Sequence, residues 1–505
     1  MTSVATLSSQ KAADAAALIA FDNSYARLPE TFYQRVKPTI VGAPKLMRVN
    51  DALAHQLGTD PAFLKSPAGV DILSGNVIAP GSEPIAQAYA GHQFGNFVPQ
   101  LGDGRAILLG EVVDAAGKRY DLQLKGSGPT RFSRRGDGRA AIGPVIREYI
   151  VSEAMFALGI PTTRSLAAVL TGETVIRERV LPGAVLTRVA SSHLRVGTFQ
   201  YFAARSDVES LRTLADYAID RHYPEARDAG DPYRAFYDAV VEALARLTAR
   251  WMLVGFIHGV LNTDNTSIAG ETIDYGPCAF MDAYHPDKVF SSIDQFGRYA
   301  FANQPAVIKW NLARFAETLL PLIANGADNA IEAANESIAR FDGHYHAAYL
   351  AGLRQKLGLT LEMESDEELG ADLLTRMAEN KADFTLTFRA LCDAARDPSR
   401  DAEARVLFSD PAAFDEWTAR WRERLSQEQQ SPEERRTSMR KVNPMFIPRN
   451  HRIEAAIANA QAGSLDKFHE LAEVLTHPYQ DQPQFAEYAK APTAHEEVQQ
   501  TFCGT

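Results

Sequence analysis

Two short runs of apolar and β-branched residues, Ala106 to Val113 and Arg119 to Lys125, flank the turn-forming residues Asp114 to Gly117. This pattern predicts two strands joined as a β-hairpin. Side chains alternate between the two faces of a strand, so the apolar residues of the second run share one face and its polar residues share the other. We therefore expect Lys125 to point away from the apolar core, toward the open side of the sheet.

A helical pattern begins at Pro144 and ends near Gly159. Its apolar residues recur at helical spacing: Ile146, Tyr149, Ile150, Met155 and Phe156. Glu148 lies on the same predicted helix. A glutamate on a helix is usually solvated, but Lys125, at the end of the preceding strand, gives this one a candidate partner.

Two further strands are predicted at Ser165 to Leu170 and at Ala184 to Val189. The second carries Arg188 and leads into a polar joint that contains Arg195. From about residue 193 the periodicity becomes helical. We therefore expect an α+β fold with a β-rich unit over residues 1–192 and a mainly helical unit over residues 193–505.

The helical half of the chain contains apolar faces that are typical of a core. Leucine and phenylalanine side chains share one face at Leu312, Phe315, Leu319 and Leu322, and aromatic rings share another at Phe414, Trp417 and Trp421. These aromatic residues are more typical of a core than of a cofactor site. The segment Ser431 to Glu434 is a helix start, with serine as the cap, proline in the first turn and glutamate reaching back.

Composition and charge limit the functional classes. At 505 residues the chain is long enough for two packed units, and its net charge of −11 argues against nucleic acid as the main partner. No apolar run is long enough to cross a bilayer, and the alanine-rich stretch from Ala13 to Ala20 is interrupted by Asp14, so neither a membrane span nor a signal peptide is expected. Three cysteines are too few for a disulfide scaffold. We therefore expect a cytoplasmic protein. We also expect a monomer, although no sequence pattern identifies the oligomeric state.

A glycine turn precedes the predicted hairpin. In Gly102-Asp103-Gly104-Arg105, two residues without side chains would let the backbone approach a phosphate and donate N–H groups to it. Most turns of this kind are plain β-turns, and only its position ahead of Lys125 favours phosphate binding. A basic island follows, which is either a solvated face or part of an anion site: Arg131, Arg134, Arg135, Arg139 and Arg147.

The segment from His258 to Asn265, followed by Asp274-Tyr275-Gly276, resembles the catalytic loop and metal motif of a protein kinase. Val260 stands where a kinase carries its catalytic aspartate. The glycine turn, Lys125 and Glu148 precede this segment in the order of the corresponding kinase parts. The order indicates a site for a nucleoside triphosphate and magnesium in which the usual catalytic aspartate is missing.

Several longer motifs resemble those of the SelO family, also called YdiU, which are pseudokinases related to selenoprotein O. The resemblance covers nearly the whole chain. The most specific motifs are Pro84 to Gly95, Gln100 to Arg105, Leu124 to Thr130, Arg134 to Arg139, His258 to Asn265, Asp274 to Cys278, Asn443-Pro444 and Arg449-Asn450.

This resemblance implies a protein-kinase-like bilobal fold, with a β-rich N-lobe and a mainly helical C-lobe. It also implies protein adenylyltransferase activity: transfer of AMP from ATP to a Ser, Thr or Tyr hydroxyl of a protein, with release of pyrophosphate. ATP would lie flipped relative to its position in a true kinase, so that the α-phosphate faces the acceptor.

The resemblance assigns roles to individual residues. Asp264 is the general base, Asn265 and Asp274 bind Mg²⁺ or Mn²⁺, and Glu148 orients Lys125. The residues implied to contact the nucleotide are Gly102, Gly104, Arg105, Lys125, Asp137, Gly138, Arg188, Arg195 and Asp274. Planar arginine forks suit two-point contact with phosphate oxygens.

Two functional alternatives stay open: an inactive ATP-binding scaffold, because Val260 removes the usual base, and an atypical kinase that transfers the γ-phosphate.

A second open question concerns the thiols. Many family members carry a selenocysteine or a cysteine pair near the C-terminus, whereas here only Cys503 is present. Cys278 and Cys503 either form a redox link or are two unpaired thiols.

Overall fold

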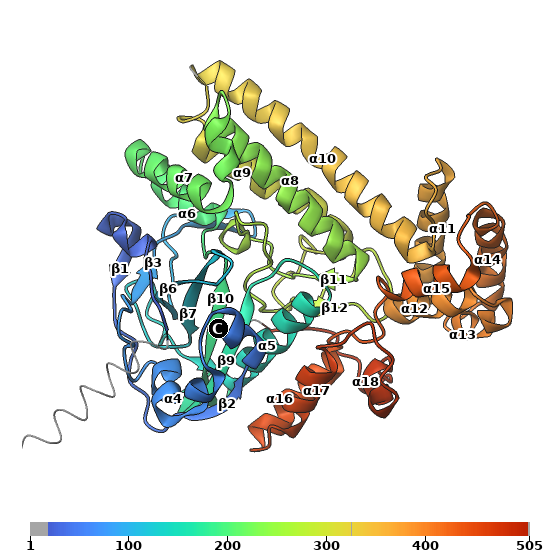
Figure 1. Ribbon diagram of the computed structural model, residues 1–505, viewed down its shortest axis with the longest axis horizontal. Helices are drawn as coiled ribbons and strands as arrows, with labels where there is room; N and C mark the ends of the chain where they lie inside the picture. The colour runs from blue at the N-terminus through green and yellow to red at the C-terminus, as the bar shows by residue number, and fades with distance from the viewer. Residues whose placement is uncertain (1–18, 325, 503–505) are drawn as a thin grey trace, which may run out of the picture.

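The computed structural model describes residues 19–324 and 326–502, and it combines a β-rich N-terminal region with a helical C-terminal region (Figure 1). The expectation of an α+β chain is confirmed at this level. Part of the stretch from Ala13 to Ala20 and the whole of Cys503 lie outside the described residues.

Within the described residues, the N-terminal region contains an eight-stranded sheet. Its strands run in the order β1-β3-β6-β7-β10-β9-β2, and β8 pairs with β10. The strands are β1 (Tyr33–Arg35), β2 (Lys45–Val49), β3 (Ile85–Gln87), β6 (Ala106–Val113), β7 (Arg119–Lys125), β8 (Ala140–Ala141), β9 (Arg164–Ile176) and β10 (Val180–Ala190). Small two-stranded sheets are formed by β4 (Gly91–Gln93) with β5 (Asn96–Val98), and by β11 (Phe256–Ile257) with β12 (Ala279–Phe280).

The hairpin β6–β7 has the predicted bounds, whereas β9 and β10 extend beyond the predicted strands because they pair with each other almost to the turn between them. The expectation of an open polar face on β7 is wrong for Asp121 and Gln123, which are both buried. Asp121 accepts hydrogen bonds from Arg221 at 2.6 Å and from the backbone N–H of His193 at 2.9 Å. The polar face of β7 is therefore an internal charged layer, and Lys125 lies at its end.

Helix α5 (Ile142–Ala157) packs on the sheet and confirms the predicted helix, with a start two residues earlier than expected. Four of the five apolar residues predicted on its core face are buried, but Phe156 is 52% exposed. Its ring lies against the guanidinium of Arg164. Glu148 is buried, unlike most glutamates on helices, as expected for a residue with a cationic partner.

Three short helices lie between β2 and β3: α2 (Asp51–Gln56), α3 (Pro61–Lys65) and α4 (Pro67–Ser74). Beyond β10 the chain is mainly helical, in α6 (Val196–Ala203), α7 (Val208–His222), α8 (Pro232–Leu253), α9 (Gln304–Leu319), α10 (Ala327–Leu357), α11 (Ser365–Asn380), α12 (Phe384–Ala394), α13 (Asp401–Arg405), α14 (Pro411–Leu425), α15 (Pro432–Arg440), α16 (Asn450–Gln461), α17 (Asp466–Val474) and α18 (Ala486–Ala489). The sheet ends at Ala190 and the first of these helices starts at Val196, which is compatible with a boundary near residue 193.

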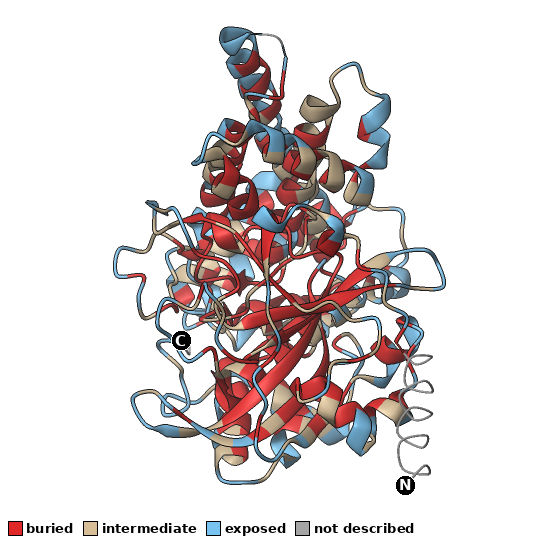
Figure 2. Ribbon diagram, turned by 90° about the vertical axis from the view of Figure 1, so that its left-hand side faces the viewer, coloured by how far each residue is buried: buried red, intermediate tan, exposed pale blue. Residues whose placement is uncertain are grey.

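The predicted cores of the helical half are confirmed. Leu312, Phe315, Leu319 and Leu322 are buried, as are Phe414, Trp417 and Trp421. Ser431 caps α15 in a capping box with Glu434, as predicted. Figure 2 shows the buried positions concentrated along the central strands and on the inner faces of the helices. In the described part of the chain, no helix is both long and apolar enough to cross a membrane.

The last helices return to the N-terminal region. Helices α16 and α17 pack against α5, and Figure 1 shows them beside it. The ring of Phe468 lies edge-on to Tyr149, with 5.3 Å between ring centroids, and Glu454 pairs with Arg147. At the start of α16, the fully buried Arg449 binds Asp383 at 2.8 Å and also pairs with Asp282. The helix that carries Glu148 is therefore covered by residues from the end of the chain.

Candidate active site

A cavity of about 440 Å³ lies between the sheet and the first part of the helical region. Among its lining residues are all but one of the predicted site residues: Gly102, Gly104, Arg105, Lys125, Asp137, Gly138, Arg188, Arg195, Asp264, Asn265 and Asp274. The exception, Glu148, lines a smaller adjoining cavity of about 210 Å³ that shares Arg105 and Lys125 with the first. The structure therefore brings together residues that lie far apart in the sequence.

Three cations converge on the carboxylate of Asp274. Lys125 Nζ donates to Asp274 Oδ1 at 2.9 Å, and a guanidinium nitrogen of Arg188 lies 2.5 Å from the same oxygen. Arg195 donates to Asp274 Oδ2 at 2.8 Å. Asp274 has a left-handed backbone, with φ of 63°, which aims its side chain into this cluster. Each cation comes from a different segment: Lys125 from β7, Arg188 from β10, and Arg195 from the residue before α6.

A second carboxylate completes the cluster. Glu148 Oε2 accepts a hydrogen bond from Lys125 Nζ at 2.6 Å, and Glu148 Oε1 lies 3.2 Å from Arg188. The predicted pair of Lys125 and Glu148 is therefore present. Burial alone would raise the pKa of Asp274, but the charges of Arg188, Lys125 and Arg195 hold it well below the usual range. Seven Lys and Arg side chains line the cavity against four Asp side chains, and this excess of positive charge suits an anionic ligand.

Arg188 is held in place by a residue that the sequence patterns do not single out. Gln123 Oε1 accepts from Arg188 at 2.6 Å, while Gln123 Nε2 donates to Asp103 Oδ2 at 3.1 Å. Burial raises the pKa of Asp103 to about 6. Asp103 lies inside the predicted glycine turn. Through Gln123, it connects that turn to Arg188 in the cation cluster.

Asp264 lies on a short 3-10 helix, Thr263–Asn265, and is buried. Its Oδ2 accepts from Gln93 Nε2 at 3.1 Å, and its Oδ1 has no hydrogen-bond partner among the described residues. Burial raises the pKa of Asp264 to about 6, and the Gln93 hydrogen bond and the charge of Arg195 partly oppose that shift. A carboxylate with one unpaired oxygen can accept a proton from a bound hydroxyl.

The absence of a side chain at Gly91 makes room for Asp264. A Cβ atom built on Gly91 would lie 2.5 Å from Asp264 Oδ1. The strand that contains Gly91 is attached to the segment His258 to Asn265, because the backbone N–H of His92 donates to Thr263 Oγ1 at 2.6 Å. Thr263 in turn donates to Gln200 Oε1 at 2.6 Å.

Asn265 and Asp274, the residues predicted to bind a metal, offer one amide oxygen and one carboxylate. Asn265 Nδ2 donates to the carbonyl of Val260 at 2.9 Å, which leaves Asn265 Oδ1 for a cation. Among the described residues, no cluster of three or more His, Cys, Asp or Glu side chains could hold a metal ion. One carboxylate and one amide oxygen fit Mg²⁺ or Mn²⁺ only if phosphate oxygens and water supply the other ligands, which is how proteins usually bind Mg²⁺.

The glycines of the predicted phosphate turn have a packing reason of their own. A Cβ atom on Gly102 would lie 2.4 Å from the ring of Phe132, and one on Gly104 would lie 2.9 Å from the Phe132 carbonyl oxygen. The absent side chains therefore admit Phe132, whether or not a phosphate approaches. Asp137 lies on the rim of the cavity, where it pairs with Arg177 at 2.8 Å, and Gly138 packs against Gly128.

Of the basic island, Arg147 is buried, and Arg134 and Arg139 line the cavity. Gln93 and Gln123, in contrast, are site residues that the sequence patterns did not assign. The motif from Pro84 to Gly95 was a signal for Gln93, but nothing local connects it to Asp264, which lies 171 positions farther along the chain.

Cys278 is buried next to the cation cluster, and burial raises the pKa of its thiol to about 12. The end of the chain lies nearby, since Thr501 donates to the carbonyl of Pro277. Because Cys503 lies outside the described residues, the redox link between Cys278 and Cys503 stays a prediction.

Comparison with known proteins identifies the family. The sequence profile described as "Protein adenylyltransferase SelO" matches residues 16–476. A "Protein nucleotidyltransferase YdiU" of Nitrobacter hamburgensis is 80% identical over 490 residues, 97% of each chain. Relatives of the same name are 77% identical in Nitrobacter winogradskyi, over 100% of each chain, and 63% identical in Bradyrhizobium diazoefficiens, over 96% of this chain and 99% of the relative. The chain therefore belongs to the SelO family of protein adenylyltransferases, and it is a nucleotidyltransferase.

Proposed function

We propose that this chain binds ATP in the cavity between the sheet and the helices and transfers AMP to a Ser, Thr or Tyr hydroxyl of a protein, with release of pyrophosphate. The observation that carries the proposal is that two different groups line the same cavity. One is the cluster of three cations around Asp274, and the other is the buried carboxylate of Asp264, which has an unpaired oxygen.

In this proposal the fold is a protein-kinase-like one with two lobes. The N-lobe and its N-terminal extension comprise residues 1–192, and the helical C-lobe and C-terminal extension comprise residues 193–505. The open cavity between the lobes is where a kinase-like fold holds its nucleotide.

The cation cluster would bind the outer two phosphates. Lys125, Arg188 and Arg195 provide donors from three directions, and the two arginines are almost wholly buried, so that their charges are poorly screened by water. They would stabilise the negative charge that develops on the leaving pyrophosphate. Glu148 and Gln123 are positioning residues that orient Lys125 and Arg188. The remaining nucleotide contacts would come from Gly102, Gly104, Arg105, Asp137 and Gly138.

Asp274 and Asn265 would hold Mg²⁺ or Mn²⁺ together with phosphate oxygens. When bound, the ion neutralises phosphate charge. Asp274 is already close to three cations, so the triphosphate must share those cations with it. We infer that metal and nucleotide bind as one unit, because each supplies the charge that the other needs.

Asp264 would act as the general base. Its carboxylate accepts the proton of the acceptor hydroxyl while the hydroxyl oxygen attacks the α-phosphorus and the bond to the pyrophosphate oxygen breaks. Val260 does not replace Asp264 in this step, because its side chain cannot accept a proton. The α-phosphate must then face Asp264, with the outer phosphates directed to the cation cluster.

The proposal is tested with ATP labelled at the α- or at the γ-phosphate, on wild type and on Asp274→Ala. We expect α-label on protein, equimolar pyrophosphate, no γ-label, and loss of both products in the variant. The matched control is Asp342→Ala, which removes an exposed carboxylate on α10 and should leave both products unchanged. Protein labelled by γ-phosphate would identify a kinase instead. No α-label from wild type, together with saturable ATP binding, would identify a scaffold.

The other expectations stay predictions. Protein substrates follow from the family, whereas a cytoplasmic location rests on composition alone and a monomeric state on no sequence pattern.

A further inference from the structure

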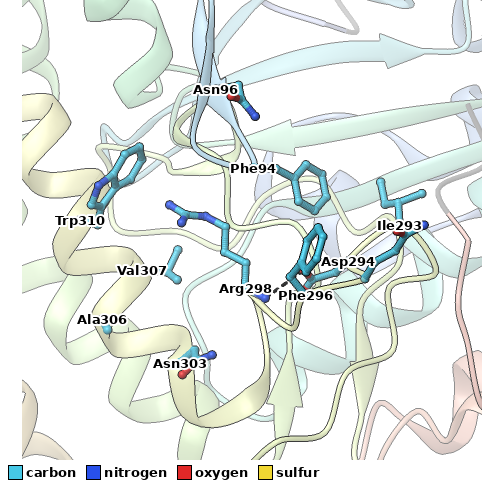
Figure 3. Close-up of a pocket in the computed structure, with 11 residues that line it drawn as sticks. Phe94, Asn96, Ile293, Asp294, Phe296, Arg298, Asn303, Ala306, Val307 and Trp310 are labelled. Carbon is cyan, nitrogen blue, oxygen red and sulfur yellow. Dashed lines mark hydrogen bonds between the residues drawn. The ribbon is translucent and has the colours of Figure 1, made fainter.

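A groove of about 740 Å³ adjoins the proposed active site (Figure 3). Three segments form it: the turn between β4 and β5, the loop over residues 293–298, and the first half of α9. Its lining is mainly apolar and aromatic, and it includes Phe94, Ile293, Phe296, Arg298, Val307 and Trp310.

The groove is continuous with the active-site cavity. Phe94 and Ile293 line both spaces. The residue before Phe94 is Gln93, whose side chain donates to Asp264 Oδ2 at 3.1 Å. A chain lying in the groove therefore reaches the proposed base within a few residues.

One wall of the groove has a strained backbone. Phe94 and Gly95 form the two-residue turn of the β4–β5 hairpin, with φ of 51° and 83°. The left-handed region is unfavourable for a bulky residue such as phenylalanine, and such strain clusters at binding sites. The backbone N–H of Phe94 is held by Asn262 Oδ1 and by the Tyr299 hydroxyl, each at 3.1 Å. The catalytic loop thus fixes the direction of the Phe94 side chain.

The loop beside Phe94 presents apolar side chains to solvent, and Figure 3 shows Ile293 and Phe296 on the same side of the groove as Phe94. Phe296 is 97% exposed and Ile293 is 53% exposed. The loop that carries them is organised by the buried Asp294, whose carboxylate accepts from the backbone N–H groups of Arg298 at 2.9 Å and Tyr299 at 2.8 Å. Neighbouring apolar side chains that are exposed on a loop held by hydrogen bonds are typical of a protein interaction site.

The groove also contains a guanidinium group that has no carboxylate partner among the described residues. The Arg298 guanidinium lies 4.8 Å from the centre of the Trp310 ring. Over the described ranges of the chain, Arg298 forms no ion pair. The nearby carboxylate of Asp294 is already committed to backbone donors. An acidic side chain in the groove would therefore find an unpaired guanidinium.

We propose that this groove docks an extended segment of the protein substrate, with an aromatic or aliphatic side chain against Phe296 and Trp310 and an acidic side chain at Arg298. The segment presents its own Ser, Thr or Tyr hydroxyl to Asp264. This docking rests on the proposed AMP transfer, and it adds a preference for apolar and acidic residues that flank the acceptor.

The test is a positional library of synthetic peptides, each with one Ser, Thr or Tyr at its centre and varied flanks, incubated with α-labelled ATP. Wild type should label peptides with apolar and acidic flanks about tenfold more than alanine-flanked ones, the size expected for one good interface contact. Phe296→Ser should remove the apolar preference, and Arg298→Glu should change the acidic preference to a basic one. A loss of folding could not produce that reversal.

The matched control is Val406→Ser, which removes a 76% exposed apolar side chain from the helical region outside the groove and should retain both preferences. Peptide labelling without flank preference, or preferences unchanged in the two groove variants, would overturn the docking while AMP transfer stands. No labelling of any peptide or protein by wild type would refute AMP transfer and the docking with it. A change in oligomeric state caused by Phe296→Ser in sedimentation would assign the groove to a second copy of the chain.

Discussion

Asp264 is the residue whose environment says most about chemistry. It is a buried carboxylate that makes one side-chain hydrogen bond, with Gln93, although three cations gather on the neighbouring Asp274. A purely structural buried acid is normally satisfied at both oxygens, because a buried polar atom without a partner costs free energy. The missing partner of Oδ1 and the raised pKa of about 6 therefore indicate a functional carboxylate better than a purely structural one.

Replacement of Asp264 by asparagine tests this role with almost no change in volume. We expect AMP transfer to fall by about 10²- to 10⁴-fold, the usual contribution of a positioned base. Nucleotide affinity should stay within about threefold, because the phosphate-binding cations are unchanged. Single-turnover transfer and calorimetric titration with a nonhydrolysable ATP analogue measure the two quantities. Transfer at the wild-type rate would contradict a base at this position.

At the scale of elements, the β4–β5 hairpin supplies several of the residues that surround Asp264. It contributes Gln93 to Asp264, Phe94 to the groove wall, and Gly91 as the space beside Asp264 Oδ1. A hairpin this short has little stability of its own. Its position depends on the hydrogen bonds from His92 and Phe94 to the catalytic loop.

Gly91→Ala should therefore impair the site more than the fold. The new Cβ would lie within 2.5 Å of Asp264 Oδ1, so the hairpin or the carboxylate must shift. We expect AMP transfer to fall at least about tenfold, since small displacements of catalytic groups are costly. The control is Gly230→Ala, where a Cβ atom meets nothing within 4 Å. Equal transfer rates for the two variants, with equal melting temperatures, would show that Gly91 is not needed for this packing.

Short-range patterns predicted the elements well where periodicity alone decides them. Strands β6 and β7 have the predicted bounds, and α5 starts within two residues of its predicted start. The same patterns misplaced Phe156 and left Asp121 and Gln123 on an open face. Those errors share a cause: burial depends on what the rest of the chain places over a residue.

The same limit applies to the candidate site. The pairing of Lys125 with Glu148 was predicted from the order of kinase-like parts, because both residues lie in neighbouring elements. The contact of Gln93 with Asp264 and the support of Arg188 by Gln123 depend on tertiary packing, which no local spacing encodes.

At the scale of the whole molecule, the helical half contains a second core around α10, α12 and α14. Lys356 is buried in it, with its Nζ 4.2 Å from the centre of the Phe388 ring. In the described parts of the chain it forms no ion pair, and burial lowers its pKa to about 7. A lysine in this position costs stability whenever it must be charged.

Lys356→Met should therefore stabilise the protein in a pH-dependent way. Below about pH 7 the folded and unfolded states of wild type both hold the charged amine, so the cost of burying it is complete. As the pH rises above about 7, only the unfolded state keeps the proton, and the gain should shrink by roughly 1.4 kcal/mol per pH unit. Urea unfolding of both proteins at about pH 7 and about pH 9 measures the difference. A gain that stays constant with pH would contradict a neutral amine in the core.

The return of α16 and α17 to α5 has a consequence for the protein's synthesis. Glu148 is translated early, but the helix that carries it is covered only by residues from Asn450 onward. Until that segment has been made, α5 lacks this cover, and Tyr149 and Arg147 lack their partners Phe468 and Glu454. A product that terminates before Asn450 would therefore lack the packing that supports the helix of Glu148, the hydrogen-bond partner of Lys125.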